Sequence, residues 1–114
     1  MDCIFCKIIK KEIPAEIEYE TKNILAFPDI HSKAPIHILI IPKKHIECVE
    51  NIKEVDKGLM GEMLLAAKEL VRKKAIKNGY RLIINCGANS GQEVPHIHIH
   101  LLAGESLGPM ICLK

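Results

Sequence analysis

The feature that most constrains the fold of this chain lies near its C-terminus, where residues 95–102 alternate histidine with an apolar residue three times. Alternate side chains of a β-strand point to opposite faces, so a strand here carries three imidazoles on one face. Ile97, Ile99 and Leu101 occupy the other face, and their burial would fix the register of the strand. We therefore expect a strand over residues 95–103. Its three histidines are His96, His98 and His100.

A solvent-facing polar side is the simplest alternative, but such sides are usually filled with Lys, Glu and Thr. A role in binding or catalysis is therefore favoured, and two roles compete. Three imidazoles can bind one catalytic metal ion with an open position, or one neutral imidazole can attack phosphorus as a nucleophile. The preceding segment, residues 85–93, contains Gly87 and Gly91. Glycine-permitted backbone lets successive N–H groups point at an oxyanion, which favours phosphate over metal.

The 114 residues are predicted to form a single domain over residues 1–114. Apolar residues make up 48% of the chain and charged residues 26%, which is typical of a globular protein. Three strands, a long helix and two more strands follow in order, so we expect an α+β domain with an antiparallel sheet. The predicted elements are a short helix over 5–11, a long helix over 56–78, and strands over 16–20, 24–27, 36–41, 80–85 and 95–103.

The long helix is predicted from apolar residues that recur at helical spacing. Asp56 is its candidate N-cap, and the chain is expected to leave the helix at Asn78 and Gly79. The strand over 36–41 is apolar on both faces, which predicts a covered central strand. His37 is an unusual residue inside it.

Charge and composition exclude several classes of protein. The net charge is only +2 with mixed signs, and the chain has two Phe, two Tyr and no Trp. Neither bulk electrostatics nor stacking on aromatic rings therefore favours a nucleic-acid partner. No signal-peptide pattern and no apolar run of about 20 residues is present. Together with an odd number of cysteines, five, this predicts a protein of the reducing cytoplasm without a membrane partner.

Cys3 and Cys6 have the spacing at which two thiolates reach one zinc ion, which then needs two further ligands. His45 and His96 are the candidates. A redox pair or two unrelated buried thiols are the alternatives, although the redox motif is expected to follow a strand that nothing before Cys3 supplies. The three other cysteines are assigned to buried positions, although Cys86 lies beside the glycine-containing loop and is open to oxidation. They are Cys48, Cys86 and Cys112.

Residues 96–102 match the signature of the histidine triad (HIT) family, and the resemblance extends over nearly the whole chain. The quoted segments are 4–9, 12–14, 26–30, 34–37, 41–45 and 91–94. Residues 42–45 and 107–110 are similar to the Hint branch, whose members hydrolyse purine nucleoside phosphoramidates. The resemblance implies a five-stranded antiparallel sheet with one long and one short helix. It also implies a homodimer in which two sheets join as ten strands.

The resemblance also implies roles for individual residues. His98 would attack the α-phosphorus of an AMP-like substrate and form a nucleotidyl-histidine, His100 would donate to phosphate oxygens, and His37 would support them. The phosphate would be held by Asn85, Gln92 and the backbone of Glu93, and the nucleoside by Phe27, Asp29 and Ile30. Core packing is the alternative for Phe27 and Ile30.

In bacterial-type members that keep both cysteines, zinc is structural and is bound by the positions of Cys3, Cys6, His45 and His96. No cofactor would then be needed for catalysis. Glu93 departs from the serine of many relatives, and residues 104–114 lack an aromatic residue found at some C-termini. The alternatives to a phosphoramidate hydrolase are a dinucleoside polyphosphate hydrolase and a nucleotide-binding scaffold protein.

Overall fold

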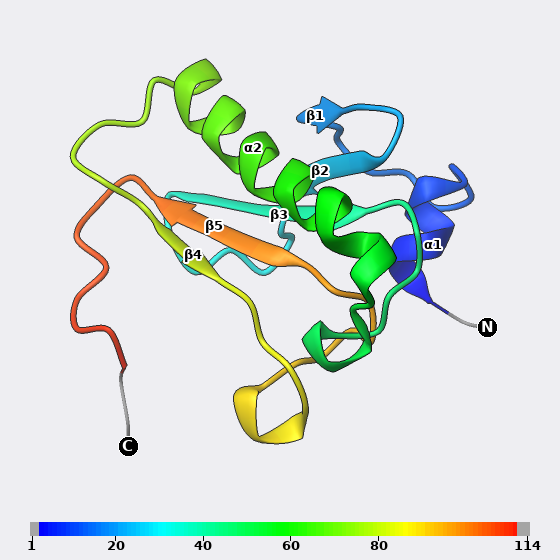
Figure 1. Ribbon diagram of the computed structural model, residues 1–114. Helices are drawn as coiled ribbons and strands as arrows, with labels where there is room; N and C mark the ends of the chain where they lie inside the picture. Colours follow the sequence, from blue (N-terminus) through cyan, green and yellow to red (C-terminus); the bar gives the residue numbers. More distant parts are fainter. Residues whose placement is uncertain (1–2, 112–114) are drawn as a thin grey trace.

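A computed structural model describes residues 3–111, which form an antiparallel five-stranded sheet with a helix on each face (Figure 1). The helices are α1 (Ile4–Ile9) and α2 (Lys57–Lys73). The sheet has the order β1-β2-β3-β5-β4, which makes β3 its middle strand. The strands are β1 (Tyr19–Glu20), β2 (Ile24–Pro28), β3 (Ile36–Pro42), β4 (Arg81–Ile83) and β5 (Ile99–Ala103), and three short 3-10 turns are η1 (Val49–Asn51), η2 (Glu54–Asp56) and η3 (Ala88–Ser90). The predicted α+β class with its antiparallel sheet and one long helix is confirmed.

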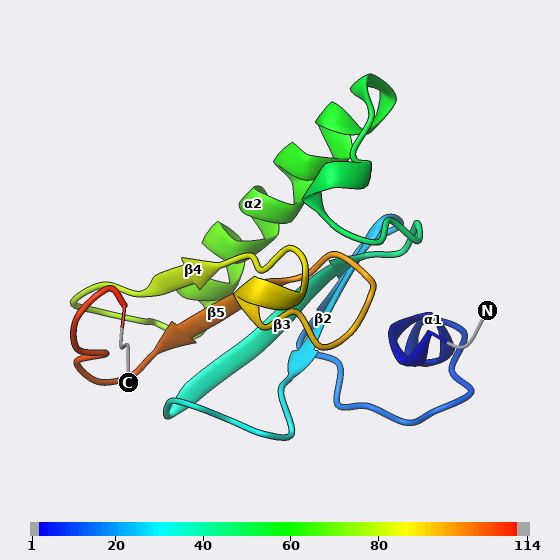
Figure 2. The same ribbon diagram turned by 90° about the horizontal axis from the view of Figure 1, so that it is seen from below.

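The two helices lie on opposite sides of the sheet, as Figure 2 shows in the view along its edge. Alternation along the central strand explains this arrangement: Ile38 and Ile40 face α2, whereas Leu39 and Ile41 face α1. From α2, Met63 and neighbouring side chains fill the larger core. Both faces of β3 are therefore covered, which confirms the sequence prediction of a central covered strand.

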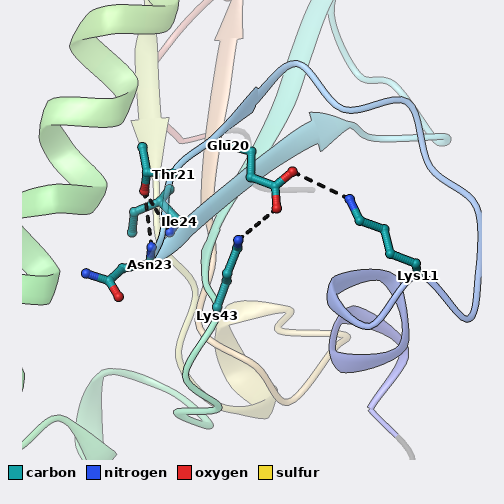
Figure 3. A network of polar contacts seen from close by, with 6 residues as sticks. All are labelled: Lys11, Glu20, Thr21, Asn23, Ile24 and Lys43. Carbon is teal, nitrogen blue, oxygen red and sulfur yellow. Dashed lines mark hydrogen bonds and ion pairs between the residues drawn. The ribbon is translucent and has the colours of Figure 1, made fainter.

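The turn between β1 and β2 is held by side chains at its base (Figure 3). Thr21 Oγ1 accepts from the backbone N–H groups of Asn23 and Ile24, at 3.3 and 3.0 Å. Glu20 pairs with Lys43 at 2.7 Å and with Lys11 at 3.5 Å, and the Lys43 hydrogen bond holds the pKa of this carboxyl below its usual range. These contacts join the edge strand to its neighbours, although β1 is shorter than the predicted strand over 16–20.

The long helix ends earlier than predicted, at Lys73 instead of Asn78. Ala75 adopts a left-handed φ of 52°, its N–H donates to the Arg72 carbonyl, and the N–H of Ile76 donates to the Val71 carbonyl. This pair of bonds is the Schellman arrangement, which satisfies the last carbonyls of the helix. The chain reverses here because Ile76 then packs against the core under α2. The predicted stop at Asn78 overlooked this apolar contact.

The start of α2 also differs from the prediction, because the Asp56 side chain does not cap this helix. Its carboxylate accepts from the Lys53 N–H at 3.0 Å and pairs with Lys44 Nζ at 2.6 Å. Asp56 therefore closes the preceding η2 turn, and α2 continues from that turn. Among the described residues, no helix is long and apolar enough to cross a membrane.

Candidate active site and metal centre

The histidine segment is not a strand along its whole length, because β5 begins only at Ile99. At the end of β3 the carbonyl of Pro42 accepts from His96 Nε2 at 2.8 Å, and the N–H of Ile97 donates to the Ile46 carbonyl. The segment thus enters the sheet only after His98. The prediction of three imidazoles on one strand face is therefore wrong, and the structure divides them between two neighbouring sites.

His96 belongs to the first site, together with three other side chains from separate segments. Its imidazole Nδ1 lies 3.3 Å from Cys3 Sγ and 3.6 Å from Cys6 Sγ. His45 Nδ1 lies 3.3 Å from Cys6 Sγ and 3.2 Å from His96 Nδ1. All four ligand atoms lie within 4.8 Å of one another, which confirms the prediction that these four residues come together.

The geometry and protonation of this cluster suit a tetrahedral metal ion. With Zn–S of about 2.3 Å and Zn–N of about 2.0 Å, tetrahedral zinc separates its ligand atoms by roughly 3.3–3.8 Å. The contacts in the cluster span 3.2–3.6 Å. Because a carbonyl only accepts, His96 carries its proton on Nε2 and keeps the Nδ1 lone pair for a metal. Cys3 is 2% exposed and His96 is fully buried, so this is a closed site of the structural kind.

The second site lies beside the cluster and contains His98, which is buried with 6% exposure. Its Nδ1 donates to the backbone carbonyl of His96 at 2.7 Å. When the ring is neutral, its proton is therefore on Nδ1, and Nε2 has a free lone pair. The Phe5 ring from α1 packs edge-on against this imidazole, with 5.2 Å between ring centroids. The bond and the packing together fix both the tautomer and the orientation of His98.

His37 and His100 form a hydrogen-bonded relay next to His98. In the β3–β5 register, Leu39 pairs with His100, so His37 is a diagonal neighbour of His100 on the same face. The Lys33 N–H donates to His37 Nδ1 at 3.0 Å, so the proton of a neutral His37 is on Nε2. This Nε2 lies 2.9 Å from His100 Nδ1 and donates to it. His100 must then carry its own proton on Nε2, which makes that atom a donor.

Burial keeps these imidazoles neutral. Burial, together with the neighbouring His98 and His37, lowers the pKa of His100 to about 4 against the opposing effect of Asp29. Burial also lowers the pKa of His37, although Asp29 Oδ2 lies 3.4 Å from its Nε2. Together, one imidazole with a free lone pair and one N–H donor can attack and bind a phosphate group.

The second site faces a cleft of about 1000 Å³ that is lined in part by residues of α1 and of the loop after β2. The cleft is lined by the predicted residues Phe27, Asp29, Ile30, His37, Asn85, Glu93, His98 and His100. Ile30 is 90% exposed at its rim, so the alternative of core packing is wrong for this residue. Phe27 is 4% exposed and packs on Phe5, so it contributes to the core and to the cleft.

Gln92 is the predicted site residue that does not line the cleft. Its Nε2 donates to the carbonyls of Glu47 and Val94, at 2.8 and 3.0 Å, and its Oε1 accepts from the Gly87 N–H at 2.9 Å. The side chain thus braces residues 86–92, which we call the glycine loop. Gln92 therefore shapes the loop beside the cleft, and its contact with a phosphate stays a prediction.

Two contributors to the site were missed by sequence reasoning. Phe5 was assigned only to a short helix, although an aromatic residue beside the cysteine pair could have indicated that α1 lies over the histidines. Lys33 acts through its backbone N–H, and because almost every residue type has this group, the sequence could not have indicated its role.

The lowered pKa of His100 predicts a pH dependence of stability. The unfolded chain binds this proton near pH 6.5 and the folded chain only near pH 4, so acidification between these values favours unfolding. We expect the free energy of unfolding to fall by on the order of 2 kcal/mol for this group. Urea titrations of the wild type and His100→Gln at pH 7 and pH 4.5 measure it. Equal losses in both proteins would contradict the assignment.

Comparison with known proteins places this chain among close relatives. Residues 2–111 match the family model described as "Scavenger mRNA decapping enzyme C-term binding". An uncharacterized HIT-like protein of Buchnera aphidicola is 49% identical over 91% of this chain and 94% of its own. The purine nucleoside phosphoramidase of Escherichia coli is 44% identical over 99% of this chain and 96% of its own. A crystal structure of a HIT family hydrolase from Legionella pneumophila is 47% identical, with a TM-score of 0.91 over 94% of this chain and 96% of its own.

Proposed function

Because the chain belongs to the histidine triad (HIT) family, we propose that it hydrolyses the P–N bond of purine nucleoside phosphoramidates. The observation that carries the proposal is the pair of ring nitrogens with opposite roles beside one cleft. Hydrogen bonds leave His98 Nε2 as an acceptor and make His100 Nε2 a donor. The name and high identity of the E. coli phosphoramidase support this substrate class.

In the proposed reaction, His98 Nε2 attacks the α-phosphorus of an adenosine 5′-phosphoramidate. A P–N bond to the imidazole forms while the P–N bond to the leaving amine breaks, and the amine takes up a proton from solvent as it leaves. Water then cleaves the nucleotidyl-histidine, which releases AMP, returns a proton to solvent and restores His98. The His96 carbonyl stabilises positive charge on the attacking ring through Nδ1–H.

His100 Nε2–H donates to the nonbridging oxygens as their negative charge grows, and His37 holds it in the required tautomer. Asn85 and the backbone of Glu93 line the cleft near the histidines and complete the phosphate site. Gln92 keeps the glycine loop in place. A preorganised donor of this kind contributes about 3 kcal/mol to transition-state stabilisation.

Asp29, Phe27 and Ile30 are proposed to bind the nucleoside. The Asp29 carboxylate lies at the cleft, where its Oδ1 accepts from the His31 N–H at 2.8 Å. This bond fixes the carboxylate so that it can accept from ribose hydroxyls. Phe27 and the exposed Ile30 provide apolar surface for the base.

Zinc is proposed to occupy the cluster of Cys3, Cys6, His45 and His96 as a structural ion. Bound there, it would neutralise the two thiolates and join α1 to the segment that carries His98. The catalytic groups lie outside this ligand set, so no step of the proposed reaction uses this ion.

A homodimer is proposed as the assembled form. β4 is an edge strand of the sheet, and it and α2 expose apolar side chains that a partner would cover. These side chains are Leu64 and Leu65 of α2, Leu82 of β4, and Ile84, which directly follows β4. Two copies joined at β4 would form one ten-stranded sheet. Analytical ultracentrifugation tests this proposal, and a measured mass of a single chain would contradict the dimer.

The substrate proposal is tested by comparing kcat/KM for adenosine 5′-phosphoramidate with kcat/KM for diadenosine polyphosphates. We expect a preference of about tenfold or more for the phosphoramidate. A preference for the polyphosphates would identify the other hydrolase class. AMP binding without turnover of either substrate would instead support a nucleotide-binding scaffold.

A further inference from the structure

Two thiols outside both sites meet at the base of the glycine loop. Cys48 directly precedes η1, and Cys86 is the first residue of the glycine loop. The Cys48 thiol and the backbone N–H groups of Glu50 and Val49 lie close enough to the Cys86 thiol to influence its pKa. The prediction that these cysteines are unrelated buried thiols is therefore wrong, since both are half-buried and adjacent. Cys112 lies outside the described residues.

The backbone on either side of the pair is held by a single side chain. Gln92 Nε2 donates to the carbonyl of Glu47, the residue before Cys48, at 2.8 Å. The Oε1 of Gln92 accepts from the N–H of Gly87, the residue after Cys86, at 2.9 Å. The two cysteines are far apart in sequence, but this amide keeps their main chains together.

The two thiols differ in their surroundings. The neighbouring Cys48 thiol and the N–H groups of Glu50 and Val49 lower the pKa of Cys86, against the opposing charge of Glu50. Contact with Cys86 raises the pKa of Cys48, whose thiol donates to Asn51 Oδ1 at 3.2 Å. One thiol that ionises more readily beside one that keeps its proton is the arrangement of an attacking and a resolving cysteine.

We propose that Cys48 and Cys86 form a redox-sensitive pair that a hydroperoxide converts to a disulfide. The Cys86 thiolate attacks the peroxide, so an S–O bond forms, the O–O bond breaks, and the leaving oxygen takes a proton as water or an alcohol. Cys48 then attacks the Cys86 sulfenic acid, the S–O bond breaks, and water leaves with the Cys48 proton. Two thiols thereby lose two protons and two electrons, and the hydroperoxide is reduced.

The test treats the zinc-loaded full-length Cys112→Ser protein with hydrogen peroxide, blocks remaining thiols by alkylation, and maps peptides by mass spectrometry. We expect one crosslinked peptide joining Cys48 to Cys86, with the mass of two hydrogen atoms lost, and its disappearance after treatment with dithiothreitol. A crosslink between Cys3 and Cys6, or oxidation without any intramolecular crosslink, would overturn the proposal.

Two further variants test the assigned order of attack in the same Cys112→Ser background. With Cys48→Ser, Cys86 should stop at a sulfenic acid that a dimedone probe captures. With Cys86→Ser, Cys48 should give little dimedone adduct at the same peroxide concentration. The reverse labelling pattern would overturn the assignment of Cys86 as the attacking thiol. Zinc content and the unfolding transition of each variant confirm that the fold is retained.

Discussion

Replacing His98 with alanine should lower turnover of an adenosine phosphoramidate by about three orders of magnitude or more. The reason is that His98 Nε2 is the ring nitrogen whose tautomer is fixed as an acceptor at the cleft, through the bond from Nδ1 to the His96 carbonyl. Without this imidazole, no other group takes over the covalent step. His96 is committed to the cysteine cluster, and the donor position of His100 is set by His37.

The matched control for this variant is His31→Ala. His31 is an exposed histidine, and the described contact at this position comes from its backbone N–H, which the substitution keeps. We expect this variant to keep turnover within about threefold of the wild type, because surface substitutions have small effects. Zinc content should equal that of the wild type in both variants, so that any loss in His98→Ala reflects chemistry.

Rapid-quench experiments in alkaline denaturant, which preserves the acid-labile P–N bond to histidine, test the covalent step directly with labelled substrate. Wild-type protein should carry a labelled nucleotide bound to His98 during turnover, and His98→Ala should carry none. Product formation at the full rate without any labelled protein at early times would contradict a nucleotidyl-histidine. A water molecule activated by the same imidazole would then be the better mechanism.

The sequence predicted the sheet well because apolar patterning is local and strong in its central strands. The segment 36–41 became β3 with one added residue, and both of its faces are buried. Prediction was poorer at element ends, where distant partners decide. The start of β5 depends on a bond from His96 to Pro42, and the end of α2 depends on the packing of Ile76. The first contact needs a backbone carbonyl from a distant segment, and the second needs the folded core, so the local sequence predicts neither.

The candidate site was predicted less evenly. Twelve of the thirteen named residues lie at the cysteine cluster or line the cleft, but their residue types did not predict their hydrogen-bond roles.

 The remaining residue is Gln92, which braces the glycine loop. Hydrogen-bond roles depend on backbone groups such as the Lys33 N–H and the His96 carbonyl. Every residue type offers these groups, so they leave no signal in a sequence.

Replacing Cys3 with serine should remove zinc from the protein and lower its free energy of unfolding by about 3 kcal/mol. Cys3 is 2% exposed, and its Sγ lies 3.3 Å from His96 Nδ1, so the variant loses one of four converging ligands. In a chain of this size the loss corresponds to a decrease in Tm of about 10 °C. Metal analysis and thermal unfolding, each with and without a chelator, measure the two effects.

Cys48→Ser is the matched control, because it removes a half-buried thiol outside the metal cluster. This variant should keep its zinc, and a chelator should destabilise it as much as the wild type. By contrast, the Tm of Cys3→Ser should hardly respond to the chelator, since its metal is already gone. A Cys3→Ser protein that still binds one zinc ion tightly would show that the cluster is not the metal site.

The same samples distinguish a structural ion from a catalytic one. The cluster and the nucleophile share His96, whose ring belongs to the cluster and whose carbonyl holds His98 Nδ1. Loss of zinc should therefore disturb His98 only through the position of this backbone, and turnover should fall by about tenfold or less while the protein stays folded. If the folded, zinc-free wild type were as inactive as His98→Ala, the metal itself would take part in the reaction. If turnover in Cys3→Ser falls only partly, and by the same factor as in the chelated wild type, zinc acts on the reaction through the position of the His96 backbone.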